Sequence, residues 1–400
     1  MDFDALWAEL APIGRYAGTG GYRRFSWTVA DAECRAWFTE RATGLGLDVR
    51  ADRNGNLWAW WGDPAAGDAV ATGSHLDSVP DGGAFDGPLG VVTALAAVGR
   101  LRESGARPRR PVAVVAFVEE EGARFGVPCL GSRLLTGAIG PEWSGGLRDA
   151  DGVSWAEAYA AAGGEPEAMG ADPELLGRLG TFVELHVEQG RGLVERGAAV
   201  GVASSIWPHG RWRMDFSGAA DHAGTTRLAD RRDPMLPFAS TVLAAREEAA
   251  IAGAVATVGK VFVEPNGTNA IPSAVHAWLD ARAPDEAALE ATVAGVLGAA
   301  RRYAAKERVE FAESRESYTG EVEFETGLRD RLSLLLGGAP ILGTGAGHDA
   351  GVLSAHVPTA MLFVRNPTGI SHSPAEHAET ADRHAGVAAL TRVLEELACA

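Results

Sequence analysis

Two short stretches constrain this chain more than any others: the loop 73–87, with the sequence GSHLDSVPDGGAFDG, and three glutamates at 119–121. The loop supplies an imidazole from His75 and a carboxylate from Asp86. The glutamates follow the apolar run 111–118, which has the character of a buried strand, so they fall where that strand ends. Zinc and similar ions bind imidazole nitrogen and carboxylate oxygen, and strand ends hold such groups well. The two stretches together predict a metal site.

Neighbouring residues in these stretches fit supporting roles. Asp77 can accept the second imidazole N–H of His75 and fix its tautomer. Two adjacent glutamates can divide the work, because one can bind metal while the other moves protons. Taken alone, a run of glutamates is more often a solvated turn, so the metal site depends on further ligands elsewhere in the chain.

Further ligands occur in two later segments, ELHVEQG at 184–190 and GISHSPAE at 369–376. Each adds a histidine among turn-forming glycines, His186 in the first and His372 in the second. The first segment has strand character, and its period of two puts Glu184 and His186 on one face. A core strand is a poor explanation for two such polar groups on one face, whereas a site explains them.

On these motifs, the chain resembles the di-zinc aminoacylase and carboxypeptidase superfamily. The closer resemblance is to its ureido-cleaving branch: N-carbamoyl-L-amino acid amidohydrolases, allantoate amidohydrolases and β-ureidopropionases. It is carried by GSHLDSV with FDGPLGV, EEEGARFG with LGSR, ELHVEQG, DHAGTT, NAIP with DAR, GAGHDA and GISHSPAE. The resemblance implies a metal-dependent amidohydrolase that cleaves a ureido C–N bond and releases ammonia and carbon dioxide.

The resemblance also implies which residues bind metal. Five ligands would hold two divalent ions per subunit: His75, Asp86 and His186 for one ion, and Asp86, Glu121 and His372 for the other. Glu120 would be the general base, which takes a proton from the attacking water and delivers it to the leaving nitrogen. Zinc or manganese is the expected metal, and cobalt and nickel accept the same ligands.

Three residues are expected to bind the substrate. Asn269 and Arg282 match positions that hold the substrate carboxylate in the family, and the guanidinium fork of Arg282 suits that task. Gln189 resembles a residue that contacts the ureido group. For Arg282, a surface ion pair with Asp280 or Asp285 is a competing interpretation.

His222, in DHAGTT, resembles a histidine that stabilises the tetrahedral oxyanion. In the family this histidine reaches from an inserted lid domain into the active site of a second subunit. The resemblance therefore implies a homodimer that associates through the lid. Without it, a lone histidine in a glycine loop would be interpreted as an exposed turn residue.

The order of the predicted elements indicates an α/β fold. Alternating helix and strand patterns predict a domain with a mixed, largely parallel sheet, whose motifs fall in loops after strands. From about residue 208 the pattern changes to a βαββαβ unit of the ferredoxin-like kind. We expect a di-metal catalytic domain at 1–207 and 318–400, and an inserted lid and dimerisation domain at 208–317. Within the first domain, a helix is expected at 91–103.

Composition limits the possible partners. The 400 residues, 46% of them hydrophobic, are enough for two or three domains. A formal net charge of −17 argues against nucleic acid or an anionic membrane as a partner, since either needs a basic face. A small anionic ureido substrate is compatible, because local arginines or metal ions reverse the sign inside a pocket. Three widely spaced cysteines and an acidic, amphipathic N-terminus favour a reducing cytoplasmic location.

Several alternatives are open on the sequence. A serine hydrolase could use Ser371 and His372, but the second glycine of a nucleophile elbow is absent. The glycine-rich stretch 343–347 lacks a full nucleotide-binding fingerprint. A non-enzymatic binding module is disfavoured, because every ligand position holds a competent residue. Within the enzyme class, a dipeptidase or an N-acyl amino acid amidohydrolase with the same metals is the alternative.

Three positions near the expected pocket depart from the family pattern. Arg227 stands where a proline commonly follows HAGTT, and Arg365 lies in a stretch that is usually apolar and small. His377 stands where an aromatic residue is common. None of the three removes a catalytic group, so it is the identity of the substrate that they affect.

Overall fold

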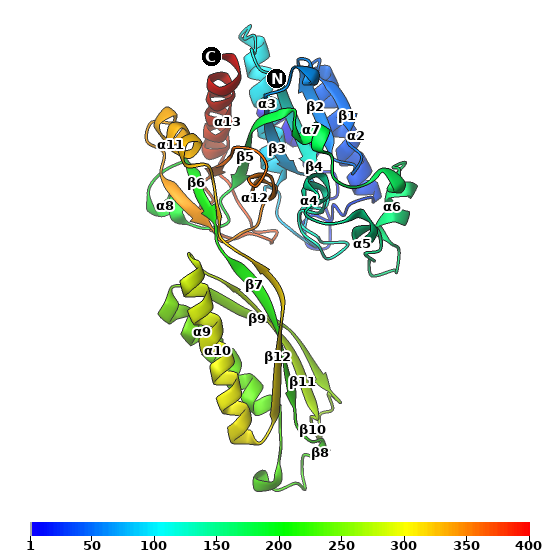
Figure 1. The fold of residues 1–400 in the computed structure, drawn as a ribbon, viewed down its shortest axis with the longest axis vertical. Coiled ribbons are helices and arrows are strands. Elements are labelled where there is room, and N and C mark those ends of the chain that lie inside the picture. The colour runs from blue at the N-terminus through cyan, green and yellow to red at the C-terminus, as the bar shows by residue number, and fades with distance from the viewer. Residues whose placement is uncertain (1) are drawn as a thin grey trace. The chain divides into compact units, whose positions relative to one another are not determined.

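The computed structural model describes residues 2–400, which form two compact units (Figure 1). Among the described residues, the first unit comprises 2–204 and 323–400, and the second comprises Ser205–Val322. The second unit contains the whole of the segment 208–317. In the part of the chain that the structure describes, no helix is long and apolar enough to cross a membrane.

A mixed sheet organises the first unit. Among the described residues its nine strands are β1 (Asp48–Ala51), β2 (Leu57–Trp61), β3 (Ala69–His75), β4 (Val112–Phe117), β5 (Leu179–Val187), β6 (Val200–Ile206), β13 (Val322–Glu323), β14 (Ile341–Thr344) and β15 (Thr359–Val364). They lie in the order β1-β2-β4-β3-β5-β15-β6-β13, with β14 beside β6. The central strands β4, β3, β5 and β15 are parallel. Because both faces of these strands are buried, their sequences are almost continuously apolar, as in VAVVAF for β4 and TAMLFV for β15.

Helices pack on this sheet and around its ends. They are α1 (Phe3–Leu10), α2 (Val29–Gly44), α3 (Pro88–Glu103), α4 (Leu130–Thr136), α5 (Pro141–Gly145), α6 (Trp155–Ala161), α7 (Pro173–Leu176), α8 (Gly192–Glu195), α11 (Thr326–Leu335), α12 (Asp349–Leu353) and α13 (Thr380–Leu394). Helix α3 is buried around nearly its whole circumference and packs in the main core with α1 and α13. It begins at Pro88 rather than at the expected residue 91, because proline fits the first helical turn directly after Gly87.

The ends of the parallel strands place the chemical groups. β3 ends at His75, β4 leads into the glutamates 119–121, β5 carries His186 next to its last residue, and β15 leads into the loop of His372. Because parallel strands have their carboxyl ends at the same edge of a sheet, these four segments meet there.

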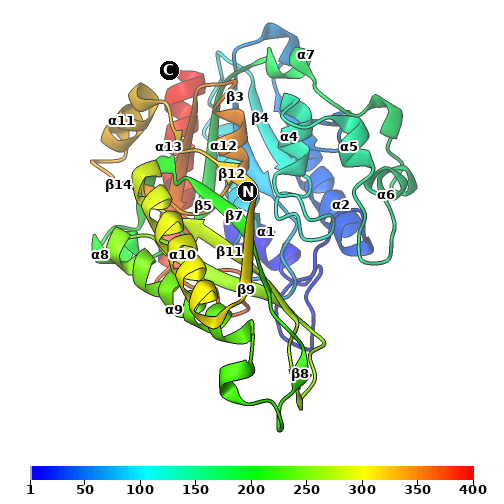
Figure 2. The ribbon, with the colours of Figure 1, turned by 60° about the horizontal axis from the view of Figure 1, so that its bottom comes forward.

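The second unit is an antiparallel sheet with two helices on one face (Figure 2). Its main elements are β7 (His209–Ser217), α9 (Met235–Ala252), β9 (Val255–Glu264), β11 (Ala274–Arg282), α10 (Glu286–Glu307) and β12 (Glu310–Thr319). The strands lie in the order β12-β7-β11-β9, and every second residue of β7 and β11 is buried in a core shared with the helices. A short pair, β8 (Asp221–His222) and β10 (Ala270–Ile271), lies at one end of this unit.

Candidate metal centre

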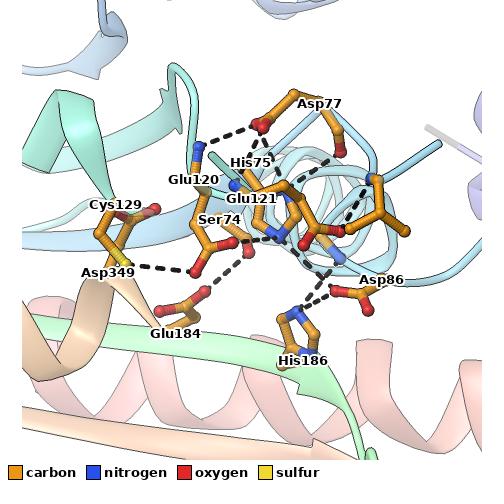
Figure 3. Close-up of polar contacts among 12 residues, drawn as sticks. Ser74, His75, Asp77, Asp86, Glu120, Glu121, Cys129, Glu184, His186 and Asp349 are labelled. Atoms are coloured by element: carbon orange, nitrogen blue, oxygen red, sulfur yellow. Dashed lines mark hydrogen bonds and ion pairs between the residues drawn. The ribbon is translucent and has the colours of Figure 1, made fainter. Parts of the chain in front are cut away.

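The first expected ligand group consists of His75, Asp86 and His186, whose side chains are buried and lie close together (Figure 3). Nε2 of His186 lies 3.2 Å from Oδ1 of Asp86, and Nε2 of His75 lies 3.7 Å from the same oxygen. One donor atom from each of the three residues falls within 4.8 Å of the others. Strand β3 can deliver His75 here because Gly73 has no side chain: a Cβ at that position would lie 1.9 Å from the carbonyl oxygen of Val115.

Asp86 also belongs to the second expected ligand group. Nε2 of His372 lies 3.4 Å from Oδ2 of Asp86 and 3.5 Å from Oε2 of Glu121. His372 has a φ of +54°, a left-handed conformation that costs energy for a histidine and often occurs at functional sites. Asp86 therefore presents one carboxylate oxygen to each group, the arrangement expected of a bridging ligand.

Nearby oxygens orient the two buried imidazoles. Nδ1 of His75 lies 3.2 Å from the backbone oxygen of Asp77 and 3.4 Å from its carboxylate, and Nδ1 of His186 lies 2.9 Å from the backbone oxygen of Val187. With Nδ1 donating, Nε2 is the unprotonated nitrogen that could bind a metal, and Nε2 of His186 accepts the backbone N–H of Gly87 at 3.2 Å. Nε2 of His75 is buried and has no hydrogen-bond partner among residues 2–400. A cation would satisfy this nitrogen.

The three adjacent glutamates take different positions. Glu119, with a φ of +54°, accepts the backbone N–H groups of 124–125. The carboxylate of Asp77 accepts the backbone N–H groups of Glu120 and Glu121, which fixes the other two glutamates. Glu119 therefore stabilises the turn, and Glu120 and Glu121 face the ligand groups.

Glu120 lies between the first ligand group and a buried thiol. Its Oε2 is 3.6 Å from Nε2 of His75, and its Oε1 accepts a hydrogen bond from Sγ of Cys129 at 3.3 Å. Burial raises the pKa of the Cys129 thiol well above its ordinary value, so the sulfur keeps its proton. Glu120 adjoins the donor groups without belonging to any of them, a position suited to proton exchange.

The carboxylates of the site are costly to ionise together. Burial raises the pKa of Glu120 well above its ordinary value, although the imidazole of His75 opposes the shift. Burial and the Asp86 carboxylate raise the pKa of Glu121 to about 8. Burial also opposes ionisation of Asp86, but His186 and the other imidazoles hold the pKa of Asp86 well below its ordinary value. A divalent cation would stabilise all three carboxylates in ionised form, so the residues present fit a metal site.

Gln189 lies against the shared aspartate. Its Nε2 donates to Oδ2 of Asp86 at 2.9 Å and to Oγ of Ser371 at 3.1 Å. Its Oε1 is buried and has no partner in the described part of the chain. The hydroxyl of Ser371 is bonded to the carboxylates of Asp86 and Glu376 rather than to a histidine base, which argues against the serine hydrolase.

Two buried residues of the site were missed as functional groups by sequence reasoning. Glu376 accepts the backbone N–H groups of Phe85 and Asp86 and so holds the loop that presents Asp86. The ring of His348 lies 4.4 Å from that of His186, and its Nε2 is buried without a partner among the described residues. Burial, followed by the nearby His186, lowers the pKa of His348 well below its ordinary value. Both residues lie in motifs quoted above, GISHSPAE and GAGHDA, but only the fold shows what they contact.

A polar layer supports the ligands from behind. Glu184, with His186 and His348, forms a third group of close donor atoms. Both carboxylate oxygens of Glu184 already accept hydrogen bonds, one from the hydroxyl of Ser74 at 2.7 Å and the other from the N–H of Ala350 at 2.9 Å. The pairing of Glu184 and His186 on one strand face therefore combines a supporting carboxylate with a candidate ligand.

The expected residues of the second unit lie at two opposite ends of it. His222 pairs with Ala270, directly after Asn269, so these residues share one end. Arg282 is the last residue of β11, and its Nε lies 2.9 Å from Oδ1 of Asp280. At ~3.3 Å per residue, β11 separates the two ends by roughly 26 Å. The ion pair with Asp280, which was the competing interpretation of Arg282, is present.

The three departures from the family pattern all contact acidic side chains. Arg227 forms an ion pair with Asp230, Arg365 pairs with Asp382 through two hydrogen bonds, and Nε2 of His377 lies 3.3 Å from Oε1 of Glu379. The partner of Arg365 is buried, so this pair stabilises the segment before the His372 loop. Nothing in the other two contacts connects them to a substrate.

A parallel-sheet edge that gathers imidazole and carboxylate donors around one shared aspartate, next to a further glutamate, is the layout of a metal-dependent hydrolase. The family model described as Peptidase family M20/M25/M40 matches residues 71–396, and the chain belongs to this family.

Similar proteins indicate that the chain lies in the ureido-cleaving branch of this family. N-carbamoyl-L-amino acid amidohydrolase of Geobacillus stearothermophilus is 36% identical over 403 residues, which cover 99% of this chain and 98% of that protein. Allantoate amidohydrolase of Escherichia coli strain K12 is 32% identical, covering 95% of this chain and 93% of that protein. A crystal structure of an amidase of the hydantoinase/carbamoylase family from Burkholderia multivorans matches with a TM-score of 0.88 and 32% identity, over 100% of this chain and 98% of that one. The resemblance to the ureido-cleaving branch is confirmed, and the family together with the donor clusters indicates divalent metal ions.

Proposed function

We propose that this protein hydrolyses the ureido C–N bond of an N-carbamoyl-L-amino acid or of allantoate, releasing ammonia and carbon dioxide. The observation that carries the proposal is the pair of donor groups that share Asp86 beside Glu120, in a chain whose relatives are named for these activities. A di-zinc dipeptidase or N-acyl amino acid amidohydrolase is the second candidate, because the same centre could attack an amide.

Two divalent ions per subunit would occupy the centre, one held by His75, Asp86 and His186 and the other by Asp86, Glu121 and His372. When bound, they would polarise the scissile carbonyl and acidify the attacking water. Zinc or manganese is proposed, and cobalt or nickel would fit the same donors. Asp77 and Glu376 would preserve the geometry by orienting His75 and the Asp86 loop.

Glu120 would act as the general base. Its Oε2 is directed towards the first ligand group, so this oxygen can take a proton from the attacking water and return it to the leaving nitrogen. The unpaired Oε1 of Gln189 would accept a ureido N–H, and the unpaired Nε2 of His348 would donate to a substrate oxygen. A buried polar atom without a hydrogen-bond partner costs free energy, so a substrate that contacts these two atoms would remove that cost.

The second unit would be a ferredoxin-like lid that also forms a homodimer. Its βαββαβ order and its sheet order β12-β7-β11-β9 support this description. Edge strand β9 and helix α9 also expose apolar side chains, including Phe262, Leu243 and Ile251. A second copy could cover this surface by two-fold pairing.

Asn269 and Arg282 would bind the substrate carboxylate, and His222 the oxyanion. Because His222 and Asn269 lie at the opposite end of the unit from Arg282, one small substrate would reach both ends only if two subunits contribute. The free thiols of Cys34, Cys129 and Cys399 support a reducing, cytoplasmic location.

The test is a substrate panel with chelator-treated protein that is reconstituted separately with zinc, manganese, cobalt and nickel. N-carbamoyl-L-amino acids and allantoate should release ammonia, whereas N-acetyl amino acids and dipeptides should be poor substrates. The protein kept without metal is the control. Turnover of dipeptides or N-acyl amino acids with no ammonia from any ureido compound would establish the second candidate instead.

Arg282→Lys is expected to lower kcat/KM about tenfold for a ureido acid, because lysine keeps the charge but loses the two-pronged hydrogen bond. The loss should be smaller for the carboxamide analogue of the same substrate. Arg211→Lys is the matched control, because Arg211 also pairs with Asp280. Equal losses of kcat/KM on the acid and on the carboxamide would show that Arg282 forms the ion pair with Asp280 and does not bind the substrate carboxylate.

A further inference from the structure

Cys129 is linked to Glu120 at two points. Its backbone N–H donates to the carbonyl oxygen of Glu120 at 2.7 Å, and its thiol donates to Oε1 of Glu120 at 3.3 Å. Cys129 has a φ of +54° and immediately precedes α4. The next two N–H groups, of Leu130 and Gly131, bond to the carbonyls of Glu119 and Val118, so this turn is tied to the glutamate segment at each residue.

The two oxygens of the Glu120 carboxylate have different surroundings. Oε1 meets the thiol, and Oε2 faces Nε2 of His75 at 3.6 Å (Figure 3). The last torsion of a glutamate side chain is broad and has no strong rotamer preference, so an external contact is needed to fix the plane of the carboxylate. In the described chain, the thiol is the hydrogen-bond donor found at Oε1.

We propose that Cys129 is a positioning residue for Glu120: its thiol holds Oε1, and Oε2 is thereby presented to the ligand groups. The inference rests on the proposed role of Glu120 as the general base. A neutral thiol is a weak donor, so it orients the carboxylate without taking over its negative charge as an arginine or lysine would. The contact keeps one oxygen of the base aimed at the reacting water throughout turnover.

Three substitutions separate positioning from packing. Cys129→Ser keeps a donor in the same place and should retain most of kcat. Cys129→Ala and Cys129→Gly remove the donor and should lower kcat about tenfold, with KM changed less than about twofold, because misplacing a catalytic group by a fraction of an ångström is costly. Glycine adopts a positive φ without strain, so Cys129→Gly removes the thiol donor while keeping the backbone conformation of this position favourable.

Cys34→Ala is the matched control, since Cys34 is also a buried cysteine but lies in the main core away from Glu120. It should lower thermal stability and leave kcat unchanged. Wild-type kcat in both Cys129→Ala and Cys129→Gly would overturn the inference, as would a loss in Cys129→Ser equal to theirs. Absence of ureido turnover in the wild type, or full activity of Glu120→Gln, would instead count against the proposed function.

The hydrogen bond can also be measured without turnover. The chain has three cysteines, so Cys129 is the only thiol in a Cys34→Ala, Cys399→Ala background. Its S–H stretching band, measured by infrared difference against Cys129→Ser, should lie at the low frequency of a bonded thiol. Glu120→Ala in this background should move the band upward. An unchanged band would show that the thiol does not donate to Glu120 and would overturn the inference.

Discussion

Glu120→Gln is expected to lower kcat on a ureido substrate on the order of 100-fold or more, with the fold and the metal content preserved. The amide keeps the shape of the side chain and can still accept a hydrogen bond from Cys129, but it cannot take up a proton. Glu120 belongs to none of the donor groups, so its loss of charge leaves all five proposed ligands in place. Kinetics and metal analysis of the same preparation measure both quantities.

Glu119→Gln is the matched control for this substitution. It makes the same chemical change one residue earlier, at a side chain whose oxygen accepts backbone N–H groups of the turn. The glutamine oxygen can still accept them, so kcat should stay within a few-fold of the wild type. If Glu120→Gln retained wild-type turnover, proton transfer would have to be reassigned to another residue.

The parts of the fold that were predictable from the sequence are those where one local pattern determines the outcome. Runs such as VAVVAF and TAMLFV have enough buried apolar side chains to specify the strands β4 and β15. Strand β6, with the sequence VGVASSI, has a weaker pattern of glycine and serine and was not predicted. It forms because it pairs with β15 on one side and with β13 and β14 on the other. The order of the strands depends equally on tertiary packing.

The candidate site also combines features that the sequence predicts with features that only the fold determines. His75, Asp86 and His186 could be proposed because each lies in a polar motif at the end of a strand. The separate position of Glu119 could not be read from EEEG, since it depends on a left-handed turn. The contact of His348 with His186 also depends on packing, because these residues are distant in sequence. Sequence patterns identify chemical groups at strand ends, and the fold decides which of them meet.

His222, at one end of the second unit, is expected to contribute strongly to kcat. Its Nδ1 accepts the backbone N–H of Gly224 at 3.0 Å, so the proton of the neutral ring is on Nε2, where it can be donated to an oxyanion. The side chain is exposed, at the end of the unit opposite Arg282. His222→Ala should therefore lower kcat on the order of 100-fold, the usual cost of removing an oxyanion donor.

If His222 acts in the site of a second subunit, two inactive variants should restore each other. Glu120→Gln and His222→Ala are mixed in equal amounts under conditions that allow subunits to exchange. Each mixed dimer then contains one site with both Glu120 and His222 intact, so random exchange should recover about a quarter of wild-type activity. Mixing Glu120→Gln with His75→Ala is the control, because both changes affect the same unit of each chain and no site becomes complete. Continued inactivity of the first mixture, after exchange has been demonstrated with labelled subunits, would place His222 in its own chain and exclude a shared site.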